Sequence, residues 1–464
     1  MLFRSTRSSD FEVDLRRAAL EGLAPDGGLY LPVEWPQFAA ADVAAMRELS
    51  YQDTAFRVLR PFLSGAMADD ALAAVIAKAY GAFRDPEVVP IIARGPFHFI
   101  ELFHGPTLAF KDVALQFVGL MFAHFLQGSG VRRTVLGATS GDTGSAAMAA
   151  LAGREGLDVF ILYPDKGPSD VQRKQMTCVR APNVHALAID GTFDDCQRIV
   201  KALFADPSRR ESWRPTTVNS INVLRILAQV VYYVVASARS DRAPTFVVPT
   251  GNFGDIFAGY VAKKCGAPIK KLVVASNKNN ILTRFFENGT MEPTGVCRTL
   301  SPSMDIQISS NFERLLFDLC QGRSERVCAL MEALRQKGSF AVTAEQLAAT
   351  RTDFAAGWAN DDETLATIKT FYDAYGYVLD PHTAVGVRVA ETALEKDEEP
   401  VYCLATAHPA KFPETIRRAL GFVPSLPSEV EALISGEERN VSLPADVERV
   451  AAFIDERKKQ WSFV

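Results

Sequence analysis

The sequence predicts an α/β protein built on mainly parallel sheets, with a helix-rich region in front of them. From about residue 98 to residue 276, short apolar segments typical of strands alternate with segments of helical periodicity. This alternation favours parallel sheets covered by helices. The first ninety or so residues read mainly as helix, as in the alanine-rich segment 70–83. The 464 residues allow two or three domains, and no proline- or serine-rich linker separates them, so we expect interleaved domains.

The expected elements follow one another along the chain. Residues 98–103 form a strand, and 110–126 form a helix because apolar residues recur there every three or four positions. Capping-box patterns at Thr192–Asp195 and Thr343–Gln346 predict helix starts. We expect further strands at 134–136, 159–162, 184–189, 246–248, 272–275 and 401–404, and further helices at 145–152, from 169, at 193–204, 221–236 and 255–264. The charged tail from residue 424 is expected on the surface.

The amino-acid composition argues against several classes of function. With 48% hydrophobic residues and 23% charged residues the chain is globular, and its net charge of −5 disfavours general binding to nucleic acid or membrane surfaces. The low count of six histidines argues against a multi-histidine metal site. The seven cysteines contain no C-x-x-C pair, which argues against a zinc ribbon or a thioredoxin-type redox site. The charged N-terminus lacks the apolar core of a signal peptide, and no segment is long and apolar enough to span a bilayer. We therefore expect a cytoplasmic protein.

Three strand-to-turn segments carry small polar residues: Gly137–Ala147 (GATSGDTGSAA), Pro249–Asp255 (PTGNFGD) and Ala405–His408. In open α/β folds ligands bind at the carboxyl ends of strands, where a following helix turns its positive dipole end toward them. Neither glycine-rich turn matches a P-loop or a dinucleotide fingerprint. Each alone is compatible with a plain βα turn, whereas the two together favour a ligand with two anionic groups.

Lys111 lies at the predicted start of a helix, directly after the apolar residues of HGPTLAFKD. The helix N-terminus and apolar neighbours both disfavour the charged amine, and a neutral amine is the nucleophile for a Schiff base. The alternative is a lysine that reaches the surface or pairs with Asp112.

The segment Asn219–Arg225 (NSINVLR) could hold a phosphate through amide, hydroxyl and guanidinium groups. The alternative is ordinary helix capping by Asn219 and Ser220, with a surface arginine. Among the histidines, His104 and His408 lie in candidate loops and are the better candidates for ligand contact, whereas His382 is expected to cap a helix.

Together these segments resemble the threonine synthase family, whose members are pyridoxal-phosphate enzymes of fold type II, the tryptophan-synthase-β-like fold. HGPTLAFKD, SGDTG, NSINxxR, GNFGD and ATAHPAKF look like family motifs and occur in the family's order. The N-terminal GLAPDGGLYLP is similar to the long branch of the family, which has an additional N-terminal region. The resemblance runs from about residue 3 to about residue 420, and it implies two interleaved α/β domains around mainly parallel sheets.

The resemblance also implies residue roles. Lys111 would form a Schiff base with pyridoxal 5′-phosphate and then act as general acid and base. The cofactor phosphate would be held by the loop Gly251, Asn252, Phe253, Gly254 and Asp255, and Thr406 would hydrogen-bond the pyridine nitrogen. The substrate carboxylate would be bound by Ser140, Gly141, Asp142 and Thr143, and the substrate phosphate by Asn219, Ser220 and Arg225. The short branch has asparagine where this chain has Asp142, so the contact of that asparagine with the ring hydroxyl is not carried over. Because Asp142 is acidic and lies beside the expected carboxylate site, we expect it to point away and accept backbone hydrogen bonds.

The implied reaction converts O-phospho-L-homoserine and water to L-threonine and phosphate, without a metal. Three alternatives stay open: a phospho-lyase that releases 2-oxobutanoate, a serine/threonine dehydratase, and a non-catalytic relative that only binds the ligand. The NSINxxR segment argues against the dehydratase, since its substrate carries no phosphate. An intact Lys111 and intact loops argue against the non-catalytic relative.

The resemblance gives a domain arrangement as well. We expect an N-terminal region at 1–95, a large cofactor-binding domain at 96–115 and 220–464, and a small α/β domain at 116–219. The expected partner is the small-molecule substrate, with neither nucleic acid nor membrane, and the chain would act as a monomer or homodimer.

Overall fold

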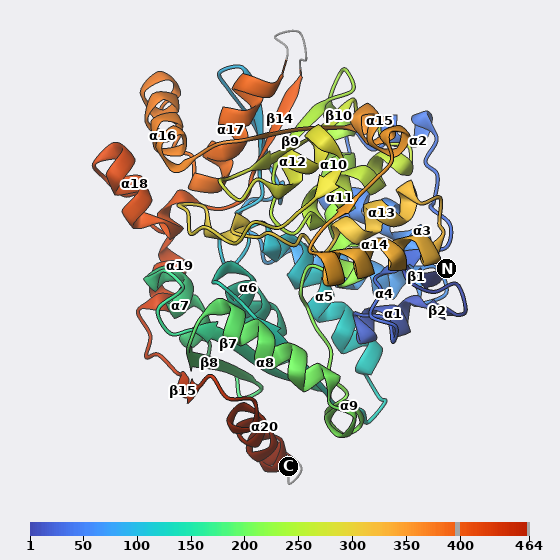
Figure 1. Cartoon of the computed structure of the whole chain (residues 1–464). Coiled ribbons are helices and arrows are strands. Elements are labelled where there is room, and N and C mark those ends of the chain that lie inside the picture. Colours follow the sequence, from blue (N-terminus) through green and yellow to red (C-terminus); the bar gives the residue numbers. More distant parts are fainter. Residues whose placement is uncertain (395–399, 462–464) are drawn as a thin grey trace.

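Two parallel sheets form the centre of the computed structural model, which describes residues 1–394 and 400–461 (Figure 1). The larger sheet has the strand order β13-β10-β9-β14-β5-β4, and all its neighbours are parallel except the edge strand β4. Its strands are β4 (Ile91–Arg94), β5 (Phe97–Glu101), β9 (Thr245–Pro249), β10 (Lys271–Ser276), β13 (Phe354–Trp358) and β14 (Val401–Ala405). The predicted α/β class with mainly parallel sheets is confirmed.

The smaller sheet has the order β15-β8-β7-β6 and is parallel throughout. Its strands are β6 (Arg133–Ala138), β7 (Leu157–Pro164), β8 (Val184–Asp190) and β15 (Val441–Pro444). Every residue of β7 is buried, which is typical of a parallel strand covered on both faces.

Helices cover both sheets, and α5 (Lys111–Leu126) runs between them, in contact with α6 on one side and α10 on the other. The helices of the larger part are α10 (Val223–Arg239), α11 (Gly254–Lys264), α12 (Ile281–Asn288), α13 (Phe312–Leu319), α14 (Ser324–Lys337), α15 (Ala344–Asp353), α16 (Asp361–Tyr375), α17 (Pro381–Ala393) and α18 (Pro413–Leu420). Those beside the smaller sheet are α6 (Asp142–Leu151), α7 (Asp170–Thr177), α8 (Phe193–Ala205), α9 (Pro207–Trp213), α19 (Ser428–Ile434) and α20 (Val447–Trp461). Two short 3₁₀ turns, η1 (Pro302–Met304) and η2 (Pro409–Lys411), and the hairpin pair β11 (Thr290–Met291) and β12 (Phe340–Ala341) complete this part.

The N-terminal region differs in part from the expectation. It contains the expected helices, α1 (Leu15–Glu21), α2 (Ala40–Ala44), α3 (Tyr51–Leu63) and α4 (Asp69–Tyr80). It also contains an antiparallel sheet of β1 (Leu2–Ser5), β2 (Glu12–Asp14) and β3 (Tyr30–Pro32), which the sequence patterns did not predict. These strands have only three or four residues, too few to show an alternating pattern. Helices α3 and α4 pack on α10 and α5, so the region supports the layer that carries Lys111.

Most of the expected elements are present within a few residues of the predicted bounds. Both predicted capping boxes are formed, at the starts of α8 and α15. The helix expected at 221–236 begins at Val223, and its N-cap is Asn222, whose Oδ1 accepts the backbone N–H of Leu224 at 3.1 Å. The hypothesis that Asn219 and Ser220 cap this helix is therefore wrong.

The C-terminal segment from residue 424 is mainly exposed, as expected, but it packs beside the smaller sheet rather than the larger one. Strand β15 adds to the smaller sheet beside β8. Helix α20 buries Val450, Ala451 and Ile454 against the apolar cluster of that sheet. These apolar residues occupy positions i, i+1 and i+4 of the helix, and the many charged residues around them obscure this pattern in the sequence. The other domain boundaries stay a prediction, and residues 395–399 and 462–464 of the expected large domain lie outside the described chain.

No helix within 1–394 and 400–461 combines the length and the hydropathy needed to cross a membrane.

Candidate active site

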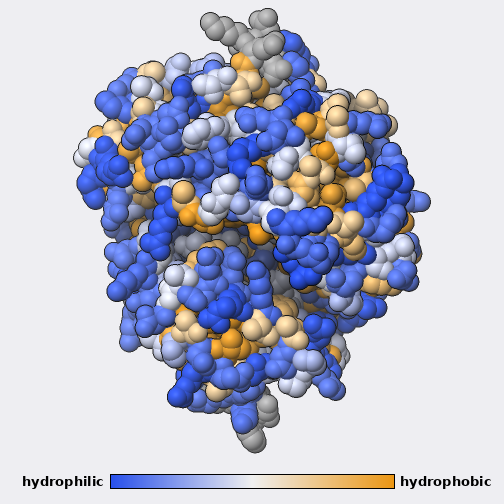
Figure 2. All heavy atoms as spheres, viewed as in Figure 1, coloured by the Kyte–Doolittle hydropathy of each residue, from blue (hydrophilic) through white to orange (hydrophobic). Residues whose placement is uncertain are grey.

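The candidate loops lie between the two sheets, at the carboxyl ends of β5, β6, β9 and β14. In the same view, the surface is hollowed between the part that holds the larger sheet and the part that holds the smaller one (Figure 2). This is the position that open α/β folds give to ligands.

Backbone pairing brings Lys111 next to the end of β14. The N–H of Phe110 donates to the carbonyl of Thr406 at 2.8 Å, and the N–H of His408 donates to the carbonyl of Leu108 at 3.0 Å. Two motifs nearly 300 residues apart are thus joined like strands. Leu108 adopts a positive φ of 63° within this turn. A bulky residue in that conformation is strained, and such strain is concentrated at functional sites.

Lys111 is the first residue of α5 and is almost completely buried. Burial lowers the pKa of its amine, and the nearby Arg225 and Lys411 charges act in the same direction, against the opposing effect of Asp142. Asp112 is not its partner, because the Asp112 carboxylate accepts the N–H and the hydroxyl of Thr107 at 2.7 and 2.8 Å. The two alternatives for Lys111, a surface lysine or a pair with Asp112, are therefore wrong.

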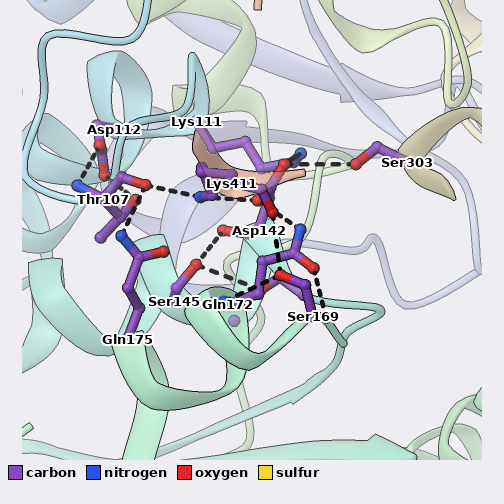
Figure 3. A network of polar contacts seen from close by, with 12 residues as sticks. Thr107, Lys111, Asp112, Asp142, Ser145, Ser169, Gln172, Gln175, Ser303 and Lys411 are labelled. Atoms are coloured by element: carbon purple, nitrogen blue, oxygen red, sulfur yellow. Dashed lines mark hydrogen bonds and ion pairs between the residues drawn. The ribbon is translucent and has the colours of Figure 1, made fainter. Parts of the chain in front are cut away.

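Asp142, at the start of α6, points toward Lys111 rather than away from it. Its Oδ2 lies 3.6 Å from Lys111 Nζ, and its Oδ1 lies 2.8 Å from Lys411 Nζ and accepts Gln172 Nε2 at 2.8 Å (Figure 3). Burial alone would raise the pKa of this carboxyl, but the two ammonium groups hold it well below its usual range. The expectation that Asp142 accepts backbone hydrogen bonds is wrong, because its partners are side chains.

The turn before Asp142 requires a glycine at position 141. Gly141 has a φ of 151°, and an added Cβ would lie 2.6 Å from the Gln172 side chain. The Thr139 hydroxyl accepts the N–H groups of Gly141 and Gly144, which fixes the turn. Ser140 and Thr143 are half-buried beside it.

The loop 251–255 opens α11. Phe253 adopts a positive φ of 63° and buries its ring against the aromatic residues Phe286, Phe312 and Phe354. The helix has no side-chain cap, so its first N–H groups have no acceptor within the helix and can bind an anion. An added Cβ on Gly251 would lie 2.8 Å from the carbonyl oxygen of Ser303, and one on Gly254 would lie 3.1 Å from Asn311. The carbonyl of Asn252 is held by Asn311.

Asp255 faces the protein interior. The hydroxyls of Tyr232 and Tyr233 donate to its Oδ1. Burial raises the pKa of this carboxyl to about 6, although both tyrosine hydrogen bonds lower it. The Asp255 side chain is thus bound to the two tyrosines in the interior. At this residue only the backbone N–H is suited to bind an anion.

Arg225 lies on the third residue of α10 and is 2% exposed. One guanidinium nitrogen donates to the Val218 carbonyl at 3.2 Å, and within the described chain Nε has no hydrogen-bond partner. Burial lowers the pKa of Arg225 to about 10. A buried guanidinium with no carboxylate in contact is costly unless a ligand pairs with it. Asn219 and Ser220 are half-buried in the turn that precedes it.

Thr406 follows β14 directly and is buried. Its N–H donates to Thr383 Oγ1 at 3.2 Å, and Thr383 in turn donates to Asp380. Asp380 also contacts His382 Nδ1 at 2.8 Å, and His382 Nε2 accepts the N–H of Ser303 at 3.2 Å. This chain of contacts connects the Thr406 strand end with the Ser303 turn.

Several residues of the site escaped the sequence patterns. Lys411 was part of a quoted motif but had no assigned role, while Gln172 and Ser303 gave no signal. The two histidines expected to be the better candidates for ligand contact have partners within the protein. His104 contacts Glu101 at 2.8 Å, and His408 accepts the N–H of Ala410 at 3.2 Å. A basic residue after proline in an apolar loop was the one available hint for Lys411.

Family comparisons fit this geometry. The chain matches three family models in succession: threonine synthase N terminus (residues 2–80), pyridoxal-phosphate dependent enzyme (99–356) and threonine synthase, C-terminal (383–454). It is 43% identical to threonine synthase of Pseudomonas aeruginosa over 98% of both chains. The chain belongs to the threonine synthase family.

Solved structures of threonine synthases agree with this assignment. The pyridoxal-phosphate-bound threonine synthase from Brucella melitensis is 47% identical and superposes with a TM-score of 0.94, over 98% of this chain and 99% of that one. Threonine synthase from yeast is 42% identical, with a TM-score of 0.93 over 99% of both chains. This chain is therefore a pyridoxal-phosphate-dependent lyase of fold type II.

We expect His408 to make the stability of this threonine synthase family member depend on pH. Burial, with the nearby Arg84 charge, lowers the pKa of His408 to about 4 from 6.5. A depressed pKa adds stability that is fully present above pH 6.5 and is lost as the pH falls toward 4. We expect the His408→Asn variant, which keeps a cap acceptor but does not titrate, to lack this loss, on the order of 3 kcal/mol. Urea unfolding at pH 7 and pH 4.5 measures it; an equal pH dependence in both proteins would contradict the assignment.

Proposed function

We propose that the chain converts O-phospho-L-homoserine and water to L-threonine and phosphate, with Lys111 as the residue that binds pyridoxal 5′-phosphate. The observation that carries the proposal is the buried Lys111 with a lowered pKa, which lies between the glycine-rich turns that follow β6 and β9. Family membership supports both the reaction and the cofactor.

The residues around Lys111 fit this cofactor. The uncapped start of α11, with glycines where a Cβ would collide, suits its phosphate. We propose a contact with the cofactor ring for Thr406, whose backbone is held by Thr383 and Phe110. Bound pyridoxal phosphate supplies the electron sink for negative charge at the substrate α carbon, and a hydroxyl partner at Thr406 leaves that sink milder than a carboxylate would.

Residues of the chain carry out the proton transfers of the proposed reaction. The Lys111 amine takes protons from the α and β carbons and returns them to the γ and α carbons. The bond between the γ carbon and oxygen breaks, and phosphate leaves with that oxygen. The water hydroxyl adds to the β carbon, and the remaining proton of the water is taken up by the released phosphate. One mobile base near adjacent carbons is sufficient for these transfers, and Lys111 is well placed to be that base.

Two anion sites would position the substrate. The Gly141 turn, with Ser140, Asp142 and Thr143, is proposed for the carboxylate at the α6 N-terminus. Arg225, with Asn219 and Ser220, is proposed for the phosphate, since within the described residues its Nε has no hydrogen-bond partner and its guanidinium can form charge-assisted hydrogen bonds. Holding both ends of the substrate fixes the carbon chain beside the base.

We further propose that the protein acts in the cytoplasm as a monomer or homodimer. The seven cysteines, all within the described residues, are free thiols, which suits a reducing compartment.

Product analysis tests the proposed reaction. The protein, loaded with pyridoxal phosphate, is incubated with O-phospho-L-homoserine, and the products are identified by nuclear magnetic resonance. We expect L-threonine and phosphate in equal amounts. Release of 2-oxobutanoate instead of threonine would show a phospho-lyase, and homoserine would show simple phosphate hydrolysis.

A further inference from the structure

A second buried lysine lies beside Lys111. Lys411, the last residue of η2, has no exposed surface. Its ammonium group donates to the carbonyl of Thr107 at 2.6 Å and pairs with Asp142 Oδ1 at 2.8 Å. Burial of an ammonium group is costly without such partners. The two contacts therefore indicate that the positive charge of Lys411, and not its packing volume, is what this position requires.

Asp142 connects the two lysines. Its Oδ1 is taken by Lys411 and Gln172, while its Oδ2 faces Lys111 Nζ at 3.6 Å and Ser303 Oγ at 3.5 Å (Figure 3). Lys411 and Gln172 hold one edge of the carboxylate from different elements, so its orientation toward Lys111 is determined by them. The Ser169 hydroxyl donates to the Lys411 carbonyl at 3.1 Å and ties η2 to the α7 N-terminus.

The charges that act on Lys111 come from four elements. Asp142 on α6 is 3.6 Å away, and Lys411 on η2, Arg225 on α10 and Asp255 on α11 interact with it electrostatically. A carboxylate near an amine favours the charged amine. If Lys411 were absent, Asp142 would have Lys111 as its one close ammonium partner, and the base would be retained in its protonated form.

We propose that Lys411 is a positioning residue for Lys111: it holds the Asp142 carboxylate in place and balances its charge, so that Lys111 is not locked in an ion pair with Asp142. The inference rests on the proposed role of Lys111 as the cofactor lysine. It also accounts for an acidic side chain beside a site for anionic ligands, because the pair with Lys411 is neutral as a whole.

The test is a pH titration of the visible absorbance of the holoenzyme, which reports protonation of the nitrogen that Lys111 shares with the cofactor. We expect Lys411→Met to raise the midpoint by about one pH unit or more, since Asp142 then interacts with that nitrogen alone. Lys411→Arg keeps the charge and should shift the midpoint much less. Lys369→Met, on an exposed lysine of α16 that pairs with Asp373, is the matched control and should leave the midpoint unchanged.

The double variant Asp142→Asn/Lys411→Met removes both charges. It tests the proposed role of Lys411 even if the single variant Lys411→Met does not fold. We expect it to restore the wild-type midpoint to within about half a pH unit, because the neutral pair is replaced by neutral groups. A midpoint that stays raised in the double variant, or that does not move in a folded Lys411→Met protein, would overturn the inference. Borohydride fixation of the cofactor to a lysine other than Lys111 would overturn the proposed function together with this inference, whereas an unmoved midpoint on Lys111 would overturn the inference alone.

Discussion

Replacement of Lys111 by alanine is expected to abolish both the visible absorbance of the bound cofactor and the turnover of O-phospho-L-homoserine. The covalent link to the cofactor and the base that moves protons are lost together, and the second of these alone contributes about 10²–10⁴-fold to the rate. Absorbance spectra after reconstitution with pyridoxal phosphate and a threonine assay provide the measurements. The fold should persist, because Asp142 keeps its ion pair with Lys411.

The matched control is Lys369→Ala, which removes an exposed lysine on α16 and should retain spectrum and activity. An unchanged spectrum in the Lys111→Ala protein would place the Schiff base on another lysine. Because Lys411 is the other buried lysine beside Asp142, it would then be the first candidate.

Replacement of Arg225 by alanine is expected to weaken O-phospho-L-homoserine binding by roughly 1.5–3 kcal/mol, the typical net contribution of a hydrogen bond to a charged group, or about 10- to 150-fold in affinity. Cofactor affinity should change little, because the cofactor phosphate is assigned to the α11 N-terminus. Competitive inhibition by inorganic phosphate should weaken in parallel. Substrate and cofactor dissociation constants, measured on the same preparations, check both statements.

The same helix provides the control for this prediction. Arg239, near the C-terminal end of α10, pairs with Glu87 at 2.7 Å on the surface, and Arg239→Ala should alter neither dissociation constant. Equal losses of substrate and cofactor affinity in Arg225→Ala would contradict the assignment of Arg225 to the substrate phosphate.

The alternating part of the fold could be predicted because its elements are long and regular. Central strands such as β7 and β9 are buried apolar runs, and helices such as α8 and α15 carry capping boxes that indicate their starts. The N-terminal sheet and β15 could not be predicted, since their strands have three or four residues and depend on tertiary pairing. The starting point of α10 was misjudged because Asn219, Ser220 and Asn222 are all acceptable caps, and the fold selects Asn222.

In the candidate site, too, features set by local sequence could be predicted, and features set by tertiary contacts could not. Lys111 could be predicted from local chemistry, since an apolar segment and a helix start surround it in the sequence. The environment of Asp142 could not, because its partners Lys411, Gln172 and Ser303 come from three distant segments that only the packing of both sheets brings together. Asp142 therefore makes side-chain contacts with distant segments, instead of the backbone hydrogen bonds expected from the sequence.

Incubation of the holoenzyme with O-phospho-L-homoserine in ¹⁸O-labelled water tests the central claim most directly. If the carbon–oxygen bond breaks and water adds to the β carbon, mass spectrometry will find one ¹⁸O atom in the threonine hydroxyl and none in the released phosphate. Label in the phosphate, accompanied by homoserine, or 2-oxobutanoate without threonine, would contradict the proposed elimination and hydration.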